Sequence, residues 1–172
     1  MASASGPRRC FDRSFAEPVR LDTDPVEDLL AIGIGSEAYA LRMAEVAGLF
    51  ADRKVTPVPG GDNVLIGIAG FRGAIVPVYG LHALLGLVSG PRPCRWLVIA
   101  AAAPVALAFE TFAAQLSVPP DAILPAQSTG QAPSCVREFV RTPKFSSPVI
   151  HLPSVLDAIK SRRGQAMPIK ET

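Results

Sequence analysis

The amino-acid sequence predicts an all-β fold in which two small barrels share one core. Three observations predict it: short runs of branched apolar residues, frequent turn signals between these runs, and a weak internal repeat. Short strands at such spacing are typical of barrels and not of a doubly wound sheet. The chain has 172 residues, of which 49% are hydrophobic, and this is enough for one domain with a substantial core.

The longest apolar stretch, Val64–Leu87, is expected to form two strands and a short helix. Branched residues stand on both sides of residues 70–73, Gly-Phe-Arg-Gly, which carry turn-forming glycines at both ends. Pro77 lacks a backbone donor, so the second strand should lie at an edge or a bend there. Three leucines within residues 81–85 then have the spacing of a helix that packs on one face.

The same stretch leaves a different interpretation open, an integral membrane protein with two hydrophobic segments. Mean hydropathy is +0.31, and a second apolar run follows at Trp96–Phe109. A spanning helix needs about 20 apolar residues. However, Val64–Leu87 contains several glycines and Pro77, and Arg72 at mid-depth would cost about 2.5–3.5 kcal/mol. Direct membrane insertion is therefore not expected, and this interpretation is kept as the alternative.

The chain repeats itself weakly. A shift of 66 residues places residues 39–47 on residues 105–113, and a shift of 71 places residues 77–85 on residues 148–156. Blocks of similar sequence fall in the same order twice, which favours two similar halves.

Each half is expected to begin with a hairpin and to end with a short helix. The first hairpin comprises Leu29–Ile34 and Tyr39–Leu49, and the second comprises Trp96–Ala100 and Val105–Phe112. The closing helix is indicated by an apolar stripe at Leu152, Val155, Leu156 and Ile159. Residues 1–26 and 161–172 are polar and are expected to be flexible tails of a domain that spans residues 27–160.

Composition excludes several classes of function. The net charge of +2 and the 6% of aromatic residues give no basic, aromatic-rich stripe, so nucleic acid is not an expected partner. Three distant cysteines without a CxxC motif are interpreted as reduced thiols of a cytosolic protein, and no secretory signal is apparent. His82 and His151 lack further donors nearby in sequence, so neither a metal site nor another cofactor is predicted.

Residues 33–38, Gly-Ile-Gly-Ser-Glu-Ala, fit the G-x-G-x-x-A pattern of a dinucleotide-binding loop. Such a loop needs a following helix whose N-terminus meets the pyrophosphate, whereas Tyr39 and its neighbours are better interpreted as a strand. A hairpin turn is therefore expected there, and an enzyme with a nucleotide site is a third interpretation. No nucleophile elbow or pair of carboxylates suggests catalysis, so no catalytic residue is predicted.

Arg72 is the residue most open to a functional interpretation. A guanidinium in an apolar corner must reach water, an acidic partner or carbonyl groups. Either Arg72 is satisfied inside the domain, for example by Glu45, or it meets a partner protein together with Phe71, Val46 and Leu49. Arginine and aromatic anchors are favoured at protein interfaces, so these last four residues form the predicted partner-binding site.

The run from Ile66 to Leu81 resembles the signature of the CheW-like domain family, an apolar-Gly-x-x-Asn-Leu-Arg-Gly-x-Ile-x-Pro-Val-x-Asp-Leu pattern. The resemblance covers residues 28–160, and it includes an opening hairpin with Gly35, Tyr39, Leu41 and Val46 in register. It implies two five-stranded SH3-like β-barrel subdomains, each half ending in a short helix after its last strand, and it implies no catalysis.

The resemblance also implies a cytoplasmic adaptor of chemotaxis signal transduction, a two-component system. Members couple the cytoplasmic tip of methyl-accepting chemoreceptors to the regulatory domain of a CheA-type histidine kinase, within receptor arrays at the membrane. This chain is similar to the standalone coupling proteins, since it has no ATPase region.

Three glycines depart from the family pattern. Gly48 stands where a glutamate is usual, and that glutamate can pair with the arginine carried here by Arg72. Gly70 stands where asparagine is usual, and Gly80 where aspartate is usual. Whether both partner surfaces are retained depends on what surrounds these positions.

Overall fold

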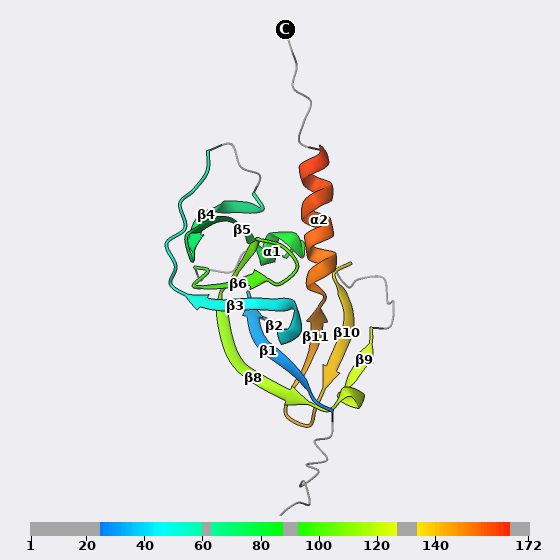
Figure 1. Cartoon of the computed structure of the whole chain (residues 1–172). Helices are drawn as coiled ribbons and strands as arrows, with labels where there is room; N and C mark the ends of the chain where they lie inside the picture. Colours follow the sequence, from blue (N-terminus) through cyan, green and yellow to red (C-terminus); the bar gives the residue numbers. More distant parts are fainter. Residues whose placement is uncertain (1–24, 60–62, 88–92, 127–133, 166–172) are drawn as a thin grey trace, which may run out of the picture.

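The computed structural model describes residues 25–59, 63–87, 93–126 and 134–165. The expected N-terminal tail at residues 1–26 lies almost wholly outside them. Within these ranges the chain forms eleven strands in two sheets, together with two α-helices (Figure 1). The prediction of an all-β fold with short helices is confirmed.

The first sheet has the strand order β8-β1-β2-β11-β10-β9. Its neighbours pair antiparallel except β2 and β11, which pair parallel. Its strands are β1 (Glu27–Ile34), β2 (Glu37–Arg42), β8 (Thr111–Val118), β9 (Ile123–Pro125), β10 (Val136–Arg141) and β11 (Ser146–Ile150). The three-residue β9 is a sixth strand in this sheet, for which five were expected.

The second sheet has the strand order β3-β6-β7-β5-β4, with β5 and β7 parallel. An antiparallel bridge between Thr56, beyond β3, and Ile68 of β4 joins the two edges and closes the barrel. Its two backbone hydrogen bonds are 2.8 and 2.9 Å long. The strands are β3 (Val46–Ala51), β4 (Leu65–Phe71), β5 (Ala74–Gly80), β6 (Trp96–Ala100) and β7 (Ala106–Phe109).

A helix follows the last strand of each half: α1 (Leu81–Leu84) follows β5, and α2 (Leu152–Gln165) follows β11. The predicted apolar stripe of α2 is buried. Residues 161–165, predicted as part of a tail, are helical. Arg162 and Arg163 are good helix formers near the carbonyl end of a helix, where cations are favoured. Short 3-10 turns at Met43–Glu45 (η1) and Pro120–Ala122 (η2) complete the described elements.

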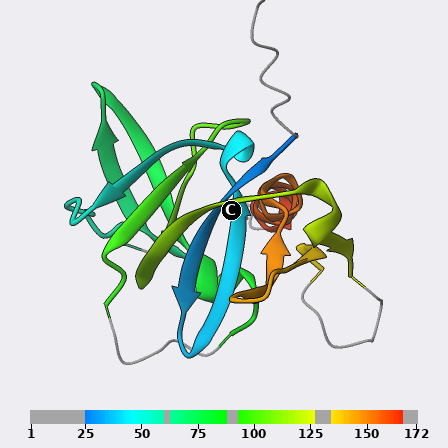
Figure 2. The same cartoon turned by 90° about the horizontal axis from the view of Figure 1, so that it is seen from below.

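The internal repeat is present in the order of the elements. Strands β1, β2 and β3 correspond to β6, β7 and β8, and β4, β5 and α1 correspond to β10, β11 and α2. However, the opening hairpin of each half lies in the sheet formed by the other half's later strands. Figure 2 shows β1 and β2 between the β3–β7 sheet on the left and β11 with α2 on the right. Each barrel is therefore built from both halves.

The two predicted hairpins were wrong in their second strands. The segment Tyr39–Leu49 divides into β2, the 3-10 turn at Met43–Glu45, and β3 in the other sheet. The segment Val105–Phe112 likewise divides between β7 and β8. Neither glycine nor proline stands where the chain passes from one sheet to the other. The packing of apolar residues in the two barrels makes the chain change sheets there.

The core matches the expectation of two barrels that share it. The largest buried cluster draws residues from both sheets and from both helices, among them Leu41, Val98, Leu81 and Leu152. A smaller cluster lies within each sheet. One contains Phe71, Val76, Val78 and Leu97, and the other contains Leu29, Ala40, Val140 and Val149.

In the described ranges, no helix has the length and apolar character that crossing a membrane requires. The apolar stretch Val64–Leu87 forms β4, β5 and α1, and Trp96–Phe109 contains β6 and β7. The glycines and Pro77 that argued against a spanning helix stand in or beside these strands.

Candidate partner-binding site

Arg72 lies at the tip of the β4–β5 hairpin. Phe71 and Ala74 are the last paired residues, so Arg72 and Gly73 form a two-residue turn. Both have positive φ, 48° and 83°, as a type I′ turn requires. Glycine adopts this conformation freely, whereas a residue such as arginine pays about 1–2 kcal/mol.

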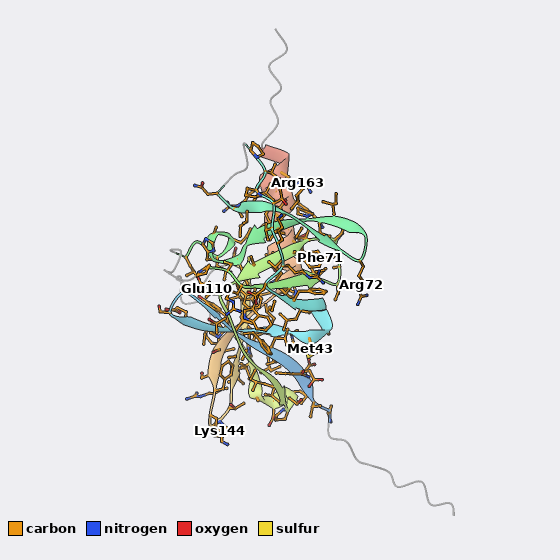
Figure 3. All side chains as sticks on the ribbon, turned by 90° about the vertical axis from the view of Figure 1, so that its left-hand side faces the viewer. Met43, Phe71, Arg72, Glu110, Lys144 and Arg163 are labelled. Carbon is orange, nitrogen blue, oxygen red and sulfur yellow. The ribbon has the colours of Figure 1, made fainter. Side chains whose placement is uncertain are left out.

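The side chain of Arg72 points away from the molecule into solvent (Figure 3). Within the described residues it forms neither a hydrogen bond nor an ion pair. Glu45, the internal partner considered for it, is engaged elsewhere. Its Oε2 accepts a hydrogen bond from the backbone N of Leu152 at 2.8 Å, and its Oε1 lies 3.8 Å from Nε2 of His151. The internal contact that would make Arg72 structural is therefore not found.

Phe71 is buried and anchors the turn from inside. It is 4% exposed and belongs to the inner cluster of the second barrel. Its ring centroid lies 4.9 Å from that of Phe50 on β3, at an interplanar angle of 55°. Phe71 thus holds Arg72 in position, and its own ring is largely covered.

Val46 and Leu49 lie on β3 and are half-buried. Both pack against the large cluster shared by the two barrels, whereas Phe50 packs in the other cluster with Phe71. Val46 and Leu49 therefore share a strand with Phe50, but the structure gives them different neighbours from Phe71 and Arg72.

Two further residues, Phe50 and Arg53, contact Phe71 next to the turn. The guanidinium carbon of Arg53 lies 5.2 Å from the ring centroid of Phe50 and 5.7 Å from that of Phe71. Both distances are within the range of a cation–π contact. The sequence places Phe50 and Arg53 directly after the predicted strand, but their proximity to Phe71 depends on closure of the barrel.

The three glycines that depart from the family pattern have different surroundings. A Cβ on Gly70 would have nothing within 4 Å. A Cβ on Gly48 would lie 2.8 Å from Cε2 of Phe50, and one on Gly80 would lie 2.9 Å from Cε1 of His82. Aromatic rings therefore occupy the space that the usual acidic side chains would need at positions 48 and 80, while position 70 is open.

The segment Gly33–Ala38 comprises the end of β1, a turn at Gly35 and Ser36, and the start of β2, with Gly35 at φ 63°. The backbone N of Gly35 donates a hydrogen bond to Oε2 of Glu110, a buried carboxylate. A strand follows the turn where a dinucleotide site needs a helix. A carboxylate also holds the amide that would have to meet a phosphate. The interpretation as a nucleotide site is therefore wrong.

Cys94, Cys135 and His151 have structural surroundings, and Cys10 lies outside the described residues. Burial raises the pKa of the Cys94 thiol, as does the charge of Glu110 to a smaller extent, and burial also raises the pKa of Cys135. The Nδ1 atom of His151 lies 2.8 Å from Oγ of Ser154 in the first turn of α2. In the part of the chain that the structure describes, no three His, Cys, Asp or Glu side chains gather as metal ligands.

Comparison with known proteins identifies the family. The CheW-like domain matches residues 28–160 of this chain. The chain belongs to the CheW-like domain family. The crystal structure of the scaffolding protein TtCheW from Thermoanaerobacter tengcongensis has a similar fold, with a TM-score of 0.66 and 18% sequence identity, over 73% of this chain and 89% of that one. A search among curated proteins found no match.

Membership of this family confirms the fold, two SH3-like subdomains, and the prediction that the chain is not an enzyme. CheW-like proteins are scaffolds of chemotaxis signalling, and they act through contacts with other proteins. The surface residues of the barrels, and not an enclosed catalytic cleft, are therefore where function is to be sought.

Proposed function

We propose that this CheW-like chain is a cytoplasmic chemosensory adaptor. It couples the cytoplasmic tip of a methyl-accepting chemoreceptor to the regulatory domain of a CheA-type histidine kinase. It is held at the membrane-bound receptor array through these partners, without inserting into the bilayer. Membership of the scaffold family supports this proposal, and so does the presence of two barrels, which offer separate surfaces to two partners.

The proposal rests on the backbone conformation of Arg72 and on its lack of an internal partner within the described residues. Arg72 adopts positive φ at a turn where glycine or asparagine costs less, and its exposed guanidinium has no internal partner within the described residues. Residues held in sparsely populated backbone conformations cluster at functional sites. Arginine is also among the residues that carry most binding energy in protein interfaces. We therefore assign Arg72 to the receptor contact, with Phe71 as its buried support.

Two variants test this assignment. Arg72→Glu reverses the charge and should weaken binding of a receptor cytoplasmic fragment from the same genome by about tenfold or more. Arg72→Gly removes the guanidinium and relieves the positive φ, so it should also weaken binding while raising the free energy of unfolding by about 1 kcal/mol. Fluorescence anisotropy gives the affinities, and urea denaturation gives the stabilities.

The control is Arg141→Glu, which makes the same charge change at an exposed position on β10. It should leave receptor affinity nearly unchanged, and all variants should still bind the kinase regulatory domain. The proposal is overturned if the natural chain binds neither partner at tens of micromolar. If Arg72→Glu unfolds the protein, Arg72 is structural and its assignment to the receptor contact is wrong.

A further inference from the structure

We infer that Arg53 and Arg72 together bind carboxylates on the receptor tip, with the rings of Phe50 and Phe71 as their platform. These four residues form the arginine platform. The inference rests on the proposed function and names the chemistry that the partner must present at this surface.

Arg53 contacts both aromatic rings of the platform. Its guanidinium lies over the faces of two rings that are themselves in contact, at 5.2 and 5.7 Å from their centroids. Among the described residues none accepts a hydrogen bond from this exposed guanidinium, so its N–H groups can donate two parallel hydrogen bonds to one carboxylate. The cation–π contact also restricts the side chain before a partner arrives, which lowers the entropy cost of binding.

Gly48 leaves room for the ring of Phe50. Because residue 48 has no Cβ, the ring of Phe50 occupies that space and reaches Phe71. The resemblance to the family pattern implies a glutamate at this position that can pair with the arginine carried here by Arg72, and glycine supplies no such carboxylate. One position therefore both creates the platform under Arg53 and leaves Arg72 without an internal anion.

The positive charge of this surface is not neutralised by the described acidic residues. Asp52 precedes Arg53, but its carboxylate accepts two hydrogen bonds from Arg95, at 2.9 and 2.7 Å. Those bonds lower the pKa of Asp52, so it stays ionised and engaged with Arg95. Among the described residues, no acidic side chain pairs with Arg53, Lys54 or Arg72.

Arg53 lies over the aromatic pair, and the exposed cations Lys54 and Arg72 directly follow Arg53 and Phe71 in sequence. This positive charge favours an anionic occupant and repels a basic one. Aromatic faces beside the cations suit an amphipathic protein surface better than a free anion. The occupant that fits this surface is therefore the cytoplasmic tip of the receptor, with Asp or Glu at the contact.

The test measures binding of a receptor cytoplasmic fragment, and in parallel of a kinase regulatory domain, both from the same genome. Arg53→Glu should weaken receptor binding by about tenfold or more at low salt and leave kinase binding within about twofold. Arg53→Lys keeps the charge but removes the planar fork of donors, so receptor affinity should fall less, by about threefold. The control Lys144→Glu makes the same charge change on the first barrel, far from Arg72 (Figure 3), and should change neither affinity.

Salt provides an independent readout. Receptor affinity of the natural chain should fall as ionic strength rises, and this slope should be shallower for Arg53→Glu than for Lys144→Glu. Equal receptor affinities for the two variants overturn the inference while leaving the adaptor function standing. A loss confined to the kinase domain also overturns it, since the platform would then face the other partner. Failure of the natural chain to bind either fragment overturns the proposed function itself.

Discussion

Gly48 decides which contacts the neighbouring aromatic side chain makes. Replacing it with glutamate, the residue usual in the family, would place a Cβ within 2.8 Å of the Phe50 ring. The ring would have to leave Phe71 and Arg53, with the loss of one aromatic contact and one cation–π contact. We expect Gly48→Glu to lower the free energy of unfolding by about 1–2 kcal/mol, as measured by urea denaturation.

The matched control is Gly70→Asn, which also restores the usual family residue. A Cβ on Gly70 meets nothing within 4 Å, so stability should stay within about 0.5 kcal/mol of the natural chain. If Gly48→Glu is equally neutral, the Phe50 ring has moved at no cost, and the platform described above is not a stable arrangement.

The sequence predicted individual residues well where the relevant contacts are local. The Gly-Phe-Arg-Gly sequence predicted a turn, Arg72 was singled out as a guanidinium in this apolar corner, and it stands at the turn. Phe50 and Arg53 were missed because they meet Phe71 only through the bridge of Thr56 to Ile68, which no local pattern reveals. For the same reason a ring assigned to the surface, that of Phe71, is buried.

At the scale of elements, the hairpin β4–β5 was predictable and the crossings between sheets were not. A hairpin needs two branched runs and a turn, and all three are adjacent in sequence. The passage from β2 to β3 needs no special residue, because both strands are apolar and a 3-10 turn at Met43–Glu45 carries the change of direction. The partners that separate them lie in β11 and β6, far along the chain.

This crossing also fixes the start of α2. The carboxylate of Glu45 accepts a hydrogen bond from the backbone N of Leu152, the first residue of the helix. Leu152 is 1% exposed, so the amide has no easy access to water. Glu45→Ala should therefore lower the free energy of unfolding by about 1–2 kcal/mol. Thermal and urea denaturation check this.

Glu45→Gln separates the hydrogen bond from the charge. Glutamine keeps an oxygen that accepts from Leu152, so only the favourable charge at the helix N-terminus is lost, about 0.3–1 kcal/mol. The exposed Glu37 at the start of β2 gives the control, and Glu37→Ala should be nearly neutral. A Glu45→Ala variant as stable as Glu37→Ala would contradict the capping role.

The whole molecule is defined by the exchange of hairpins between its halves. The first half supplies β1 and β2 to one sheet, and β3, β4 and β5 to the other. The largest buried cluster takes residues from both halves. The weak sequence repeat indicated two similar halves but could not show this exchange, because a repeat records the order of elements and not which sheet each one joins.

Because the halves exchange hairpins, neither half should fold without the other. In a fragment of residues 1–89, β1 and β2 would lack β8 and β11, and the shared core would be open to water. Fragments 1–89 and 90–172 should each show no cooperative thermal transition by circular dichroism, and mixing them should restore a compact 1:1 complex with one transition. The control is the full chain cut by a protease site placed at residues 88–92, which should stay folded. A cooperative transition in either fragment by itself would show that one half forms its own barrel, against the strand order described here.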